Sequence, residues 1–285
     1  MYRALPHQLF PIADGAKRFY HEQWGISENK VSVEQPIKAD MGFVTTLNAL
    51  TKDFHWICVE VSERAYYDSL DRFVLDCKNA NLPVKLYVAM PKVESGSFKA
   101  DLTRARNNGV GVLEISNTQT TVLLEALSLP LTGVRVPDTK EFPSKYRQTI
   151  ATAIHTFRNG NPAKGCADLY DELEGLSRRI AAKAAKNGYW RGQTPPPPQS
   201  LHSMPWARLM KNLISNFDSG SSNSPALTDA LFGRVLGVTP HRNDVAHKPA
   251  NQKDLIKRQS ELRTRFENVS DILKDLVIAS RSLRV

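Results

Sequence analysis

The hydrophobic pattern of this chain changes its period partway along the sequence, and that change limits the folds the chain can adopt. Up to residue 116, short runs rich in β-branched and aromatic residues alternate with segments of helical periodicity. The expected strands are 31–34, 42–47, 55–61, 83–90 and 110–115, and the expected helices are 7–24, 70–77 and 98–108. This alternation predicts an α/β domain with a mixed sheet.

From residue 145 onward the pattern is helical. Apolar residues recur every three or four positions, which predicts an all-α bundle of about five helices. The expected helices are 145–157, 163–186, 206–217, 227–236 and 255–277. Between 188 and 205 there is no amphipathic pattern, and four consecutive prolines occupy 195–198. An exposed polyproline-like loop is expected there, serving as a spacer or binding a proline-recognising partner.

The two patterns meet in residues 128–144, which contain Pro130, Gly133, Pro137 and Pro143 without clear periodicity. That composition is typical of a linker. We therefore expect an α/β domain over 1–127, a linker over 128–144 and a helical domain over 145–285. A chain of 285 residues is long enough for two domains that each bury a core.

Composition narrows the class of protein. With 41% hydrophobic and 24% charged residues, the chain is globular rather than disordered. No apolar run approaches the length of a membrane span, and charged and proline residues interrupt the region where a signal peptide would lie, so a cytoplasmic protein is expected. Cys58, Cys77 and Cys166 fit neither a disulfide framework nor a zinc pattern, and the seven histidines lack metal-ligand spacing. We expect no metal and no cofactor.

The net charge of +9 is unevenly distributed. Residues 1–142 hold 16 Lys and Arg against 17 Asp and Glu, a net charge of −1, whereas residues 143–285 hold 22 against 12, a net charge of +10. A basic C-terminal half is expected if that half binds a polyanion such as a nucleic acid. A basic surface that only promotes solubility explains the charge equally well.

One stretch of the basic half, residues 241–247, combines a fixed cation, an amide and an imidazole in the sequence His-Arg-Asn-Asp-Val-Ala-His. Thr239 and Pro240 precede it and have the residue types of a helix N-cap and a first helical turn. A helix that opens at these two residues is therefore expected to carry the motif. Four residues separate Asn243 from His247, so the two side chains would share a face of that helix.

Arg242 and His247 would lie about 140° apart around the helix axis, so one copy cannot enclose a small group, whereas two copies related by a two-fold axis can. This arrangement resembles the HEPN superfamily (higher eukaryotes and prokaryotes nucleotide-binding), whose nucleases carry Arg, four to six residues and then His, usually with a polar residue after the Arg. Arg242, Asn243 and His247 match that pattern.

The HEPN resemblance implies metal-independent RNA cleavage by a homodimer, which leaves a 2′,3′-cyclic phosphate and a 5′-hydroxyl. His247 would transfer protons, because an imidazole titrates near neutral pH. Arg242 would bind the charged phosphate, and Asn243 would orient His247 or bind a phosphate. These three are the expected catalytic residues.

Three neighbouring residues are expected to bind substrate. His241 is interpreted as a flanking phosphate contact, although exposure alone also explains it. Asp244 would hold Arg242 or the His247 of a second copy, although the helix dipole also explains an acidic residue in a first turn. Lys248 completes the expected set of substrate-binding residues.

Residues 7 to 116 resemble a second family, the restriction-endonuclease-like PD-(D/E)xK fold. Glu60 matches the Glu of that motif, but Ser62 stands where the Lys should be, and Asp40 is the nearest upstream acid. Without the Lys and the metal-binding Asp, this half is expected to be catalytically inactive and to serve binding, sensing or dimerisation, with a possible regulatory partner. Glu34, Asp40 and Glu60 form either a weak metal site or ordinary structural carboxylates, and the second interpretation is favoured.

Three functions remain open from the sequence. The first is a HEPN-type RNA endonuclease that acts as a toxin or defence effector. The second is a nucleic-acid-binding or adaptor protein, in which Arg242 and Asn243 cap and pair within the bundle while His247 packs at a dimer interface. The third is a metal-dependent DNA nuclease in the N-terminal half, against which Ser62 argues. The sequence identifies neither the RNA target nor the trigger.

Overall fold

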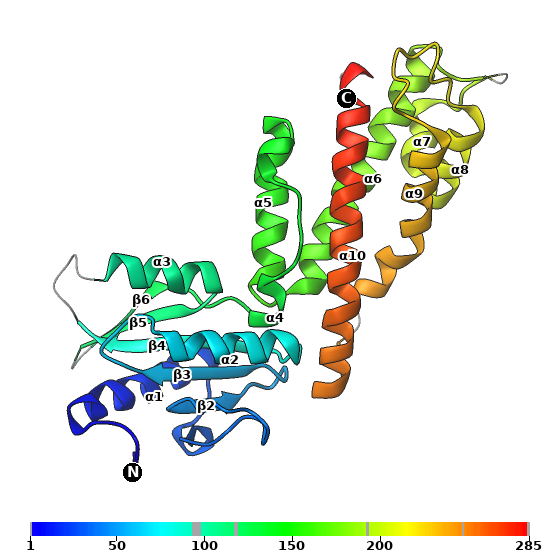
Figure 1. The fold of residues 1–285 in the computed structure, drawn as a ribbon. Helices are drawn as coiled ribbons and strands as arrows, with labels where there is room; N and C mark the ends of the chain where they lie inside the picture. The colour runs from blue at the N-terminus through cyan, green and yellow to red at the C-terminus, as the bar shows by residue number, and fades with distance from the viewer. Residues whose placement is uncertain (1, 93–97, 117–118, 192–193, 247, 284–285) are drawn as a thin grey trace. The chain divides into compact units, whose positions relative to one another are not determined.

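A computed structural model of the chain describes residues 2–92, 98–116, 119–191, 194–246 and 248–283 (Figure 1). The chain divides into two compact units. Unit 1 comprises Met1–Val134, Arg158–Gly160 and Pro249–Ser260, and unit 2 comprises Arg135–Phe157, Asn161–Lys248 and Glu261–Val285. The chain therefore passes between the units several times.

Unit 1 contains a six-stranded mixed sheet whose strands follow one another in sequence order. The strands are β1 (Ser32–Val33), β2 (Leu47–Leu50), β3 (Trp56–Val61), β4 (Val84–Pro91), β5 (Gly111–Ile115) and β6 (Thr120–Leu124). The central strands β3, β4 and β5 are parallel, while β1–β2, β2–β3 and β5–β6 pair in antiparallel fashion. The expected α/β architecture with a mixed sheet is confirmed.

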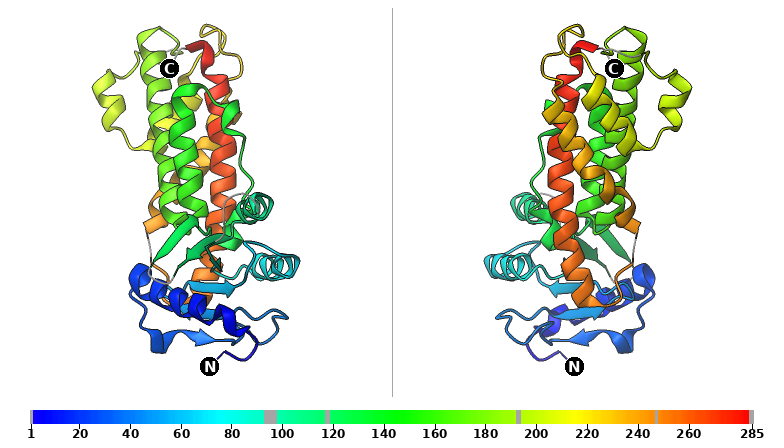
Figure 2. Two further views of the ribbon diagram at one scale, coloured as in Figure 1. Left: turned by 90° about the vertical axis from the view of Figure 1, so that its left-hand side faces the viewer. Right: turned by 90° about the vertical axis from the view of Figure 1, so that its right-hand side faces the viewer.

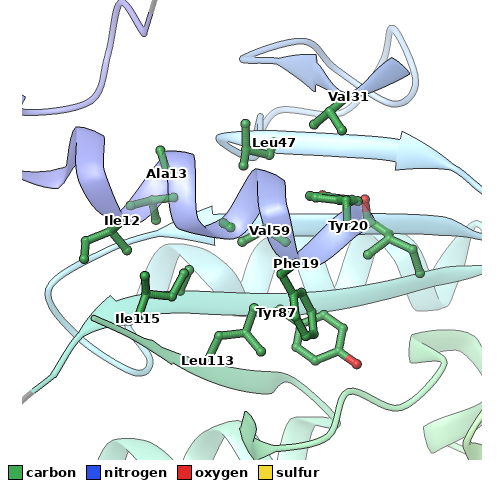
Figure 3. Packing of buried hydrophobic residues seen from close by; sticks show 14 of the residues in the cluster. Ile12, Ala13, Phe19, Tyr20, Val31, Leu47, Val59, Tyr87, Leu113 and Ile115 are labelled. Carbon is green, nitrogen blue, oxygen red and sulfur yellow. The ribbon is translucent and has the colours of Figure 1, made fainter. Parts of the chain in front are cut away.

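One face of the sheet is covered by α1 (Phe10–Trp24), which follows the short helix η1 (His7–Leu9). Figure 3 shows Ala13, Phe19 and Tyr20 of α1 directed toward side chains of the strands. Gly15 permits this close approach, because a Cβ at that position would lie 2.4 Å from the Cγ2 of Ile115. Gly25 ends α1 in the left-handed conformation, as its position after the helical pattern predicts.

The other face of the sheet packs against α2 (Asp68–Asn79) and α3 (Lys99–Asn108). Leu70, Phe73 and Val74 of α2 are buried against β3 and β4, as their helical spacing predicts. This core also receives Ile256, from the first turns of α10 (Gln252–Ala279), and the side-chain amide of Asn81 donates to the carbonyl of Ile256 at 2.9 Å. Helices on both faces bury most residues of the parallel strands, as parallel sheets require.

Two strand predictions were inaccurate. The strand expected at 42–47 begins only at Leu47, because the backbone N–H of Thr46 donates to the carboxylate of Glu60 at 2.9 Å. Strand β6, with the sequence Thr-Thr-Val-Leu-Leu, was missed. Just before it, the backbone N–H of Ser116 donates to the carbonyl of Gln119 at 2.9 Å. The short helix η2 (Glu28–Lys30) precedes β1.

Unit 2 is helical, and three of its helices pack on one another: α5 (Ser144–Arg158), α6 (Pro162–Lys186) and α10 (Figure 2). Gly165 of α6 packs so closely on α5 that a Cβ would lie 2.7 Å from that of Phe157. The rings of Phe157 and Phe266 pack together with 4.2 Å between their centroids, and this contact links α5 to α10. The thiol of Cys166 completes the triangle by donating to the carbonyl of Leu262 at 3.5 Å.

The remaining helices of unit 2 are shorter. They are α7 (Pro198–Ser203), α8 (Trp206–Asn216), α9 (Asp229–Val238), η4 (Thr239–Ala246) and η5 (Arg281–Leu283). The expectation of an exposed loop over 188–205 was partly wrong, because α7 begins at Pro198 and buries Leu201. Proline is compatible with the first turn of a helix, where its missing N–H has no intrahelical acceptor.

Residues 128–144, expected to form a linker, contain α4 (Leu129–Thr132) and η3 (Thr139–Glu141). Leu129 and Leu131 are buried in unit 1, and Phe142 is buried in unit 2. Asp138 and Glu141 form a capping box around η3. Among all the described helices, none combines the length and the apolar character needed to cross a membrane.

Candidate functional site

The motif does not open a new α-helix, so the expectation of an N-cap at Thr239 was wrong. Helix α9 continues beyond the expected end at residue 236 to Val238, and the motif follows on the 3₁₀ helix η4. Pro240 explains the change of geometry, since it cannot supply the N–H that would bond the carbonyl of Leu236 in an α-helix. The Thr239 hydroxyl donates to that carbonyl instead, at 2.9 Å.

The 3₁₀ conformation changes which side chains of the motif are neighbours. Three residues per turn bring positions i and i+3 onto one face. Accordingly, His241 and Asp244 are adjacent, with 3.5 Å between Nδ1 and Oδ2. The expected partnership of Asn243 with His247 assumed an α-helix, and His247 lies outside the described residues. Asn243 and Lys248 are both exposed.

Arg242 is held by two carboxylates of helix α6. Its Nη2 lies 3.0 Å from Oδ1 of Asp171, and its Nη1 is in an ion pair with Oε2 of Glu174. Asp171 and Glu174 are three residues apart and therefore share one face of α6. The Arg242 side chain remains 43% exposed, so this clamp fixes the guanidinium while leaving part of it open to solvent.

Glu174 is buried and serves two arginines. Its Oε1 accepts a hydrogen bond of 3.0 Å from Nε of Arg178, one turn later on α6. Arg178 also donates to the carbonyls of Leu201 at 2.8 Å and Met204 at 3.0 Å, in and after α7. Glu174 therefore forms an i,i+4 pair with Arg178 and also binds the arginine of the motif.

Asp244 has different partners from those expected. Arg242 pairs with Asp171 and Glu174 rather than with Asp244, so that part of the expectation was wrong. The carboxylate of Asp244 instead lies 3.5 Å from Nδ1 of His241 and 3.7 Å from Nη1 of Arg265, on α10. Arg265 is distant in sequence from the motif, and no pattern in the sequence pointed to it.

Two buried aromatic residues flank this cluster. Tyr170, one residue before Asp171, meets Trp206 of α8 edge to face, with 6.4 Å between ring centroids. Neither the Tyr170 hydroxyl nor the indole N–H of Trp206 has a hydrogen-bond partner among the described residues. Burial raises the pKa of Tyr170 to about 12, so its hydroxyl stays protonated at neutral pH.

The acidic residues of unit 1 each have their own partners. Glu60 accepts hydrogen bonds from the backbone N–H and hydroxyl of Thr46, at 2.9 and 3.0 Å, and from the Tyr67 hydroxyl at 2.7 Å. Glu34 accepts two backbone N–H groups, and Asp40 pairs with Lys38 at 2.9 Å. Within the described residues, no group of three or more His, Cys, Asp or Glu side chains is arranged to hold a metal.

No protein-family model, curated protein or solved structure matches this chain.

Proposed function

We propose that the protein is a metal-independent endoribonuclease of HEPN type, in which Arg242, Asn243 and His247 are catalytic. The observation that supports this function is the clamp on Arg242. Two carboxylates of α6 hold a partly exposed guanidinium within the only stretch of the sequence that has the Arg-Asn-x3-His spacing. A cation fixed in advance stabilises a charged transition state without reorganising during the reaction.

The reaction requires no cofactor, because the RNA supplies its own nucleophile. The 2′-hydroxyl loses its proton and attacks the adjacent phosphorus, while the P–O5′ bond breaks and the leaving oxygen takes up a proton. One imidazole cannot readily act as base and acid in the same step, so a homodimer supplies a second His247. Arg242 stabilises the charge on the phosphorane-like transition state.

The remaining residues of the motif support binding. Lys248 places positive charge beside the RNA backbone and His241 makes a flanking phosphate contact, while the carboxylate of Asp244 lies 3.5 Å from Nδ1 of His241. Unit 1 in this proposal is a restriction-endonuclease-like domain without catalytic activity that recognises a trigger or a regulatory partner. The filled hydrogen-bond sites of Glu60 support that inactivity, because a carboxylate bound by three donors is poorly disposed to take a metal. Such a nuclease would act in the cytoplasm as a toxin or defence effector.

A second candidate function is a non-catalytic nucleic-acid-binding or adaptor protein. One observation favours it: the two negative charges of Asp171 and Glu174 match the two positive charges of Arg242 and Arg178. An arginine whose charge is already compensated can serve only to tie η4 to α6. The two candidates differ in whether loss of Arg242 changes a reaction rate or only stability.

RNA cleavage by the purified full-length protein separates these functions. We expect total RNA to be cleaved in the presence of EDTA, leaving 2′,3′-cyclic phosphate ends. Arg242→Ala and His247→Ala should each lower the rate at least about 100-fold. Arg234→Ala is the matched control, because Arg234 forms an exposed pair with Asp275 at 2.7 Å outside the motif. Cleavage unaffected by both motif variants, or no cleavage by the wild-type protein, would contradict the proposal.

A further inference from the structure

Arg265 is a second arginine beside the motif, and the contacts around it differ from those of Arg242. Its side chain is 25% exposed, so it is more shielded from water than Arg242 at 43%. Its ion pair with Asp244, at 3.7 Å, is longer than the 3.0 Å contact of Arg242 with Asp171. The described part of the chain gives Arg265 no carboxylate other than Asp244 and no hydrogen-bond acceptor.

The two arginines therefore differ in what a phosphate would have to displace. A phosphate approaching Arg242 competes with two carboxylates, one of which is buried and is also bound by Arg178. A phosphate approaching Arg265 competes with one exposed carboxylate, that of Asp244, whose contact with Arg265 is 3.7 Å long. Charge-assisted hydrogen bonds are also stronger where water is partly excluded, as it is around Arg265.

Asp244 occupies the position that an anionic ligand would take, because its carboxylate lies between Nδ1 of His241 and Nη1 of Arg265. We propose that Arg265 is a phosphate-binding residue of the RNA site. In the absence of RNA, the carboxylate of Asp244 pairs with the guanidinium of Arg265, and an RNA phosphate replaces that carboxylate on binding. This inference rests on the proposed ribonuclease function and deepens it. Arg242 is then mainly a positioning and transition-state residue, while Arg265 holds the backbone of the substrate.

The proposal makes an unusual prediction about Asp244. If its carboxylate competes with the RNA, Asp244→Asn should bind RNA more tightly, by about three- to tenfold, whereas Arg265→Gln should bind it more weakly by a similar factor. The double variant should resemble Arg265→Gln, since removal of a competitor has no effect once its cation is gone. Arg265→Gln should also lower the slope of log K against log salt by about 0.7, the loss of one phosphate contact to a single strand.

Binding can be measured by fluorescence anisotropy with a single-stranded RNA whose 2′-hydroxyls are methylated, which prevents cleavage. The matched controls are Asp275→Asn and Arg234→Gln, a pair with the same charges that lies about 15 Å along α10 from Arg265. These controls should leave affinity within about twofold of the wild type and preserve the slope. A general charge effect would instead strengthen binding by Asp275→Asn as much as by Asp244→Asn and weaken binding by Arg234→Gln as much as by Arg265→Gln.

The outcomes also distinguish this inference from the function on which it rests. Wild-type protein that cleaves and binds RNA, together with an Arg265→Gln variant of unchanged affinity and slope, overturns only the role of Arg265. An Asp244→Asn variant that binds no better than Asp275→Asn overturns the competition by Asp244. Wild-type protein that neither cleaves nor binds RNA overturns both proposals.

Discussion

The two units stabilise shielded ionisable groups in opposite ways. In unit 1, burial shifts pKa values toward the neutral form: it raises the pKa of Glu60 and lowers the pKa of His55 and of Lys85. The partners of Glu60 are uncharged, namely two groups of Thr46 and the Tyr67 hydroxyl. In unit 2, the buried carboxylate of Glu174 is bound by the guanidinium groups of Arg178 and Arg242.

This difference separates a structural carboxylate from one that can serve a site. Three uncharged donors bind the carboxylate oxygens of Glu60, and they place no charged group beside it that could bind a ligand. Two arginines on Glu174 leave one excess positive charge, which Asp171 offsets at the exposed end of the cluster. A buried ion pair often contributes little net stability, and its most plausible value is to fix a conformation. Here the conformation fixed is that of the Arg242 guanidinium.

Loss of the Glu174 charge should produce the largest effect on stability. Glu174→Gln leaves Arg178 and Arg242 facing each other with no buried anion between them, so the free energy of unfolding should fall by about 3–5 kcal/mol. The control is Glu172→Gln on the same helix, whose pair with the 44% exposed Arg179 is worth less than about 1 kcal/mol. Urea denaturation measures both. Equal losses in the two variants would show that the Glu174 cluster is an ordinary surface network.

Removal of one neutral donor in unit 1 should have an intermediate effect. Tyr67→Phe deletes the 2.7 Å hydrogen bond to Glu60, and a hydrogen bond to an ionised group contributes about 1.5–3 kcal/mol. Because Glu60 has no charged partner among the bonds described, this loss should persist at high salt. Urea denaturation at two salt concentrations tests it. A loss of stability that disappears in 1 M salt would mean that Glu60 is stabilised by charged groups rather than by the hydrogen bond from Tyr67.

Hydrophobic periodicity predicted the secondary structure correctly in segments where that local pattern alone determines the conformation. The strand 55–61 and the helices α1, α2, α6 and α10 all have a single hydrophobic pattern that agrees with their burial. Predictions failed where a tertiary contact overrides the local signal. Thr46 is withdrawn from the expected strand by its bond to Glu60, and α7 forms in a proline-rich segment because Leu201 finds a buried position.

The candidate site was only partly accessible to the same reasoning. Adjacency in sequence identified the motif, and the positions of Asp171 and Glu174 on one face of α6 were visible as an i,i+3 pair. Nothing local connects either residue to Arg242, which lies 71 residues after Asp171. The conformation of η4 was also mispredicted, because Thr239 and Pro240 suit a helix N-terminus as well as they suit the end of α9. Partners contributed by other helices require the fold to be known.

The smallest predicted effect concerns the pH dependence of unfolding, which tests whether unit 1 keeps its shielded ionisable groups neutral. Burial lowers the pKa of His55 below its ordinary value of 6.5, so the unfolded chain binds more protons than the folded chain in that range. The stability contributed by neutral His55 is therefore complete above pH 6.5 and is lost as the pH falls below it. His55→Phe keeps a ring and removes the titration, and between pH 7.5 and pH 5.5 it should lose less stability than the wild type, by less than about 1 kcal/mol.

His155 provides the matched control for that experiment, because it lies exposed on α5 in unit 2. His155→Phe should leave the pH dependence of unfolding close to that of the wild type, since the side chain of His155 is exposed in the folded chain. Urea denaturation at several pH values gives the comparison. If His55→Phe and the wild type lose stability in parallel, the Nε2 of His55 is hydrated or charged in the folded state. Unit 1 would then tolerate a shielded cation, in contrast to Glu60 and Lys85, whose pKa values burial shifts toward the neutral form.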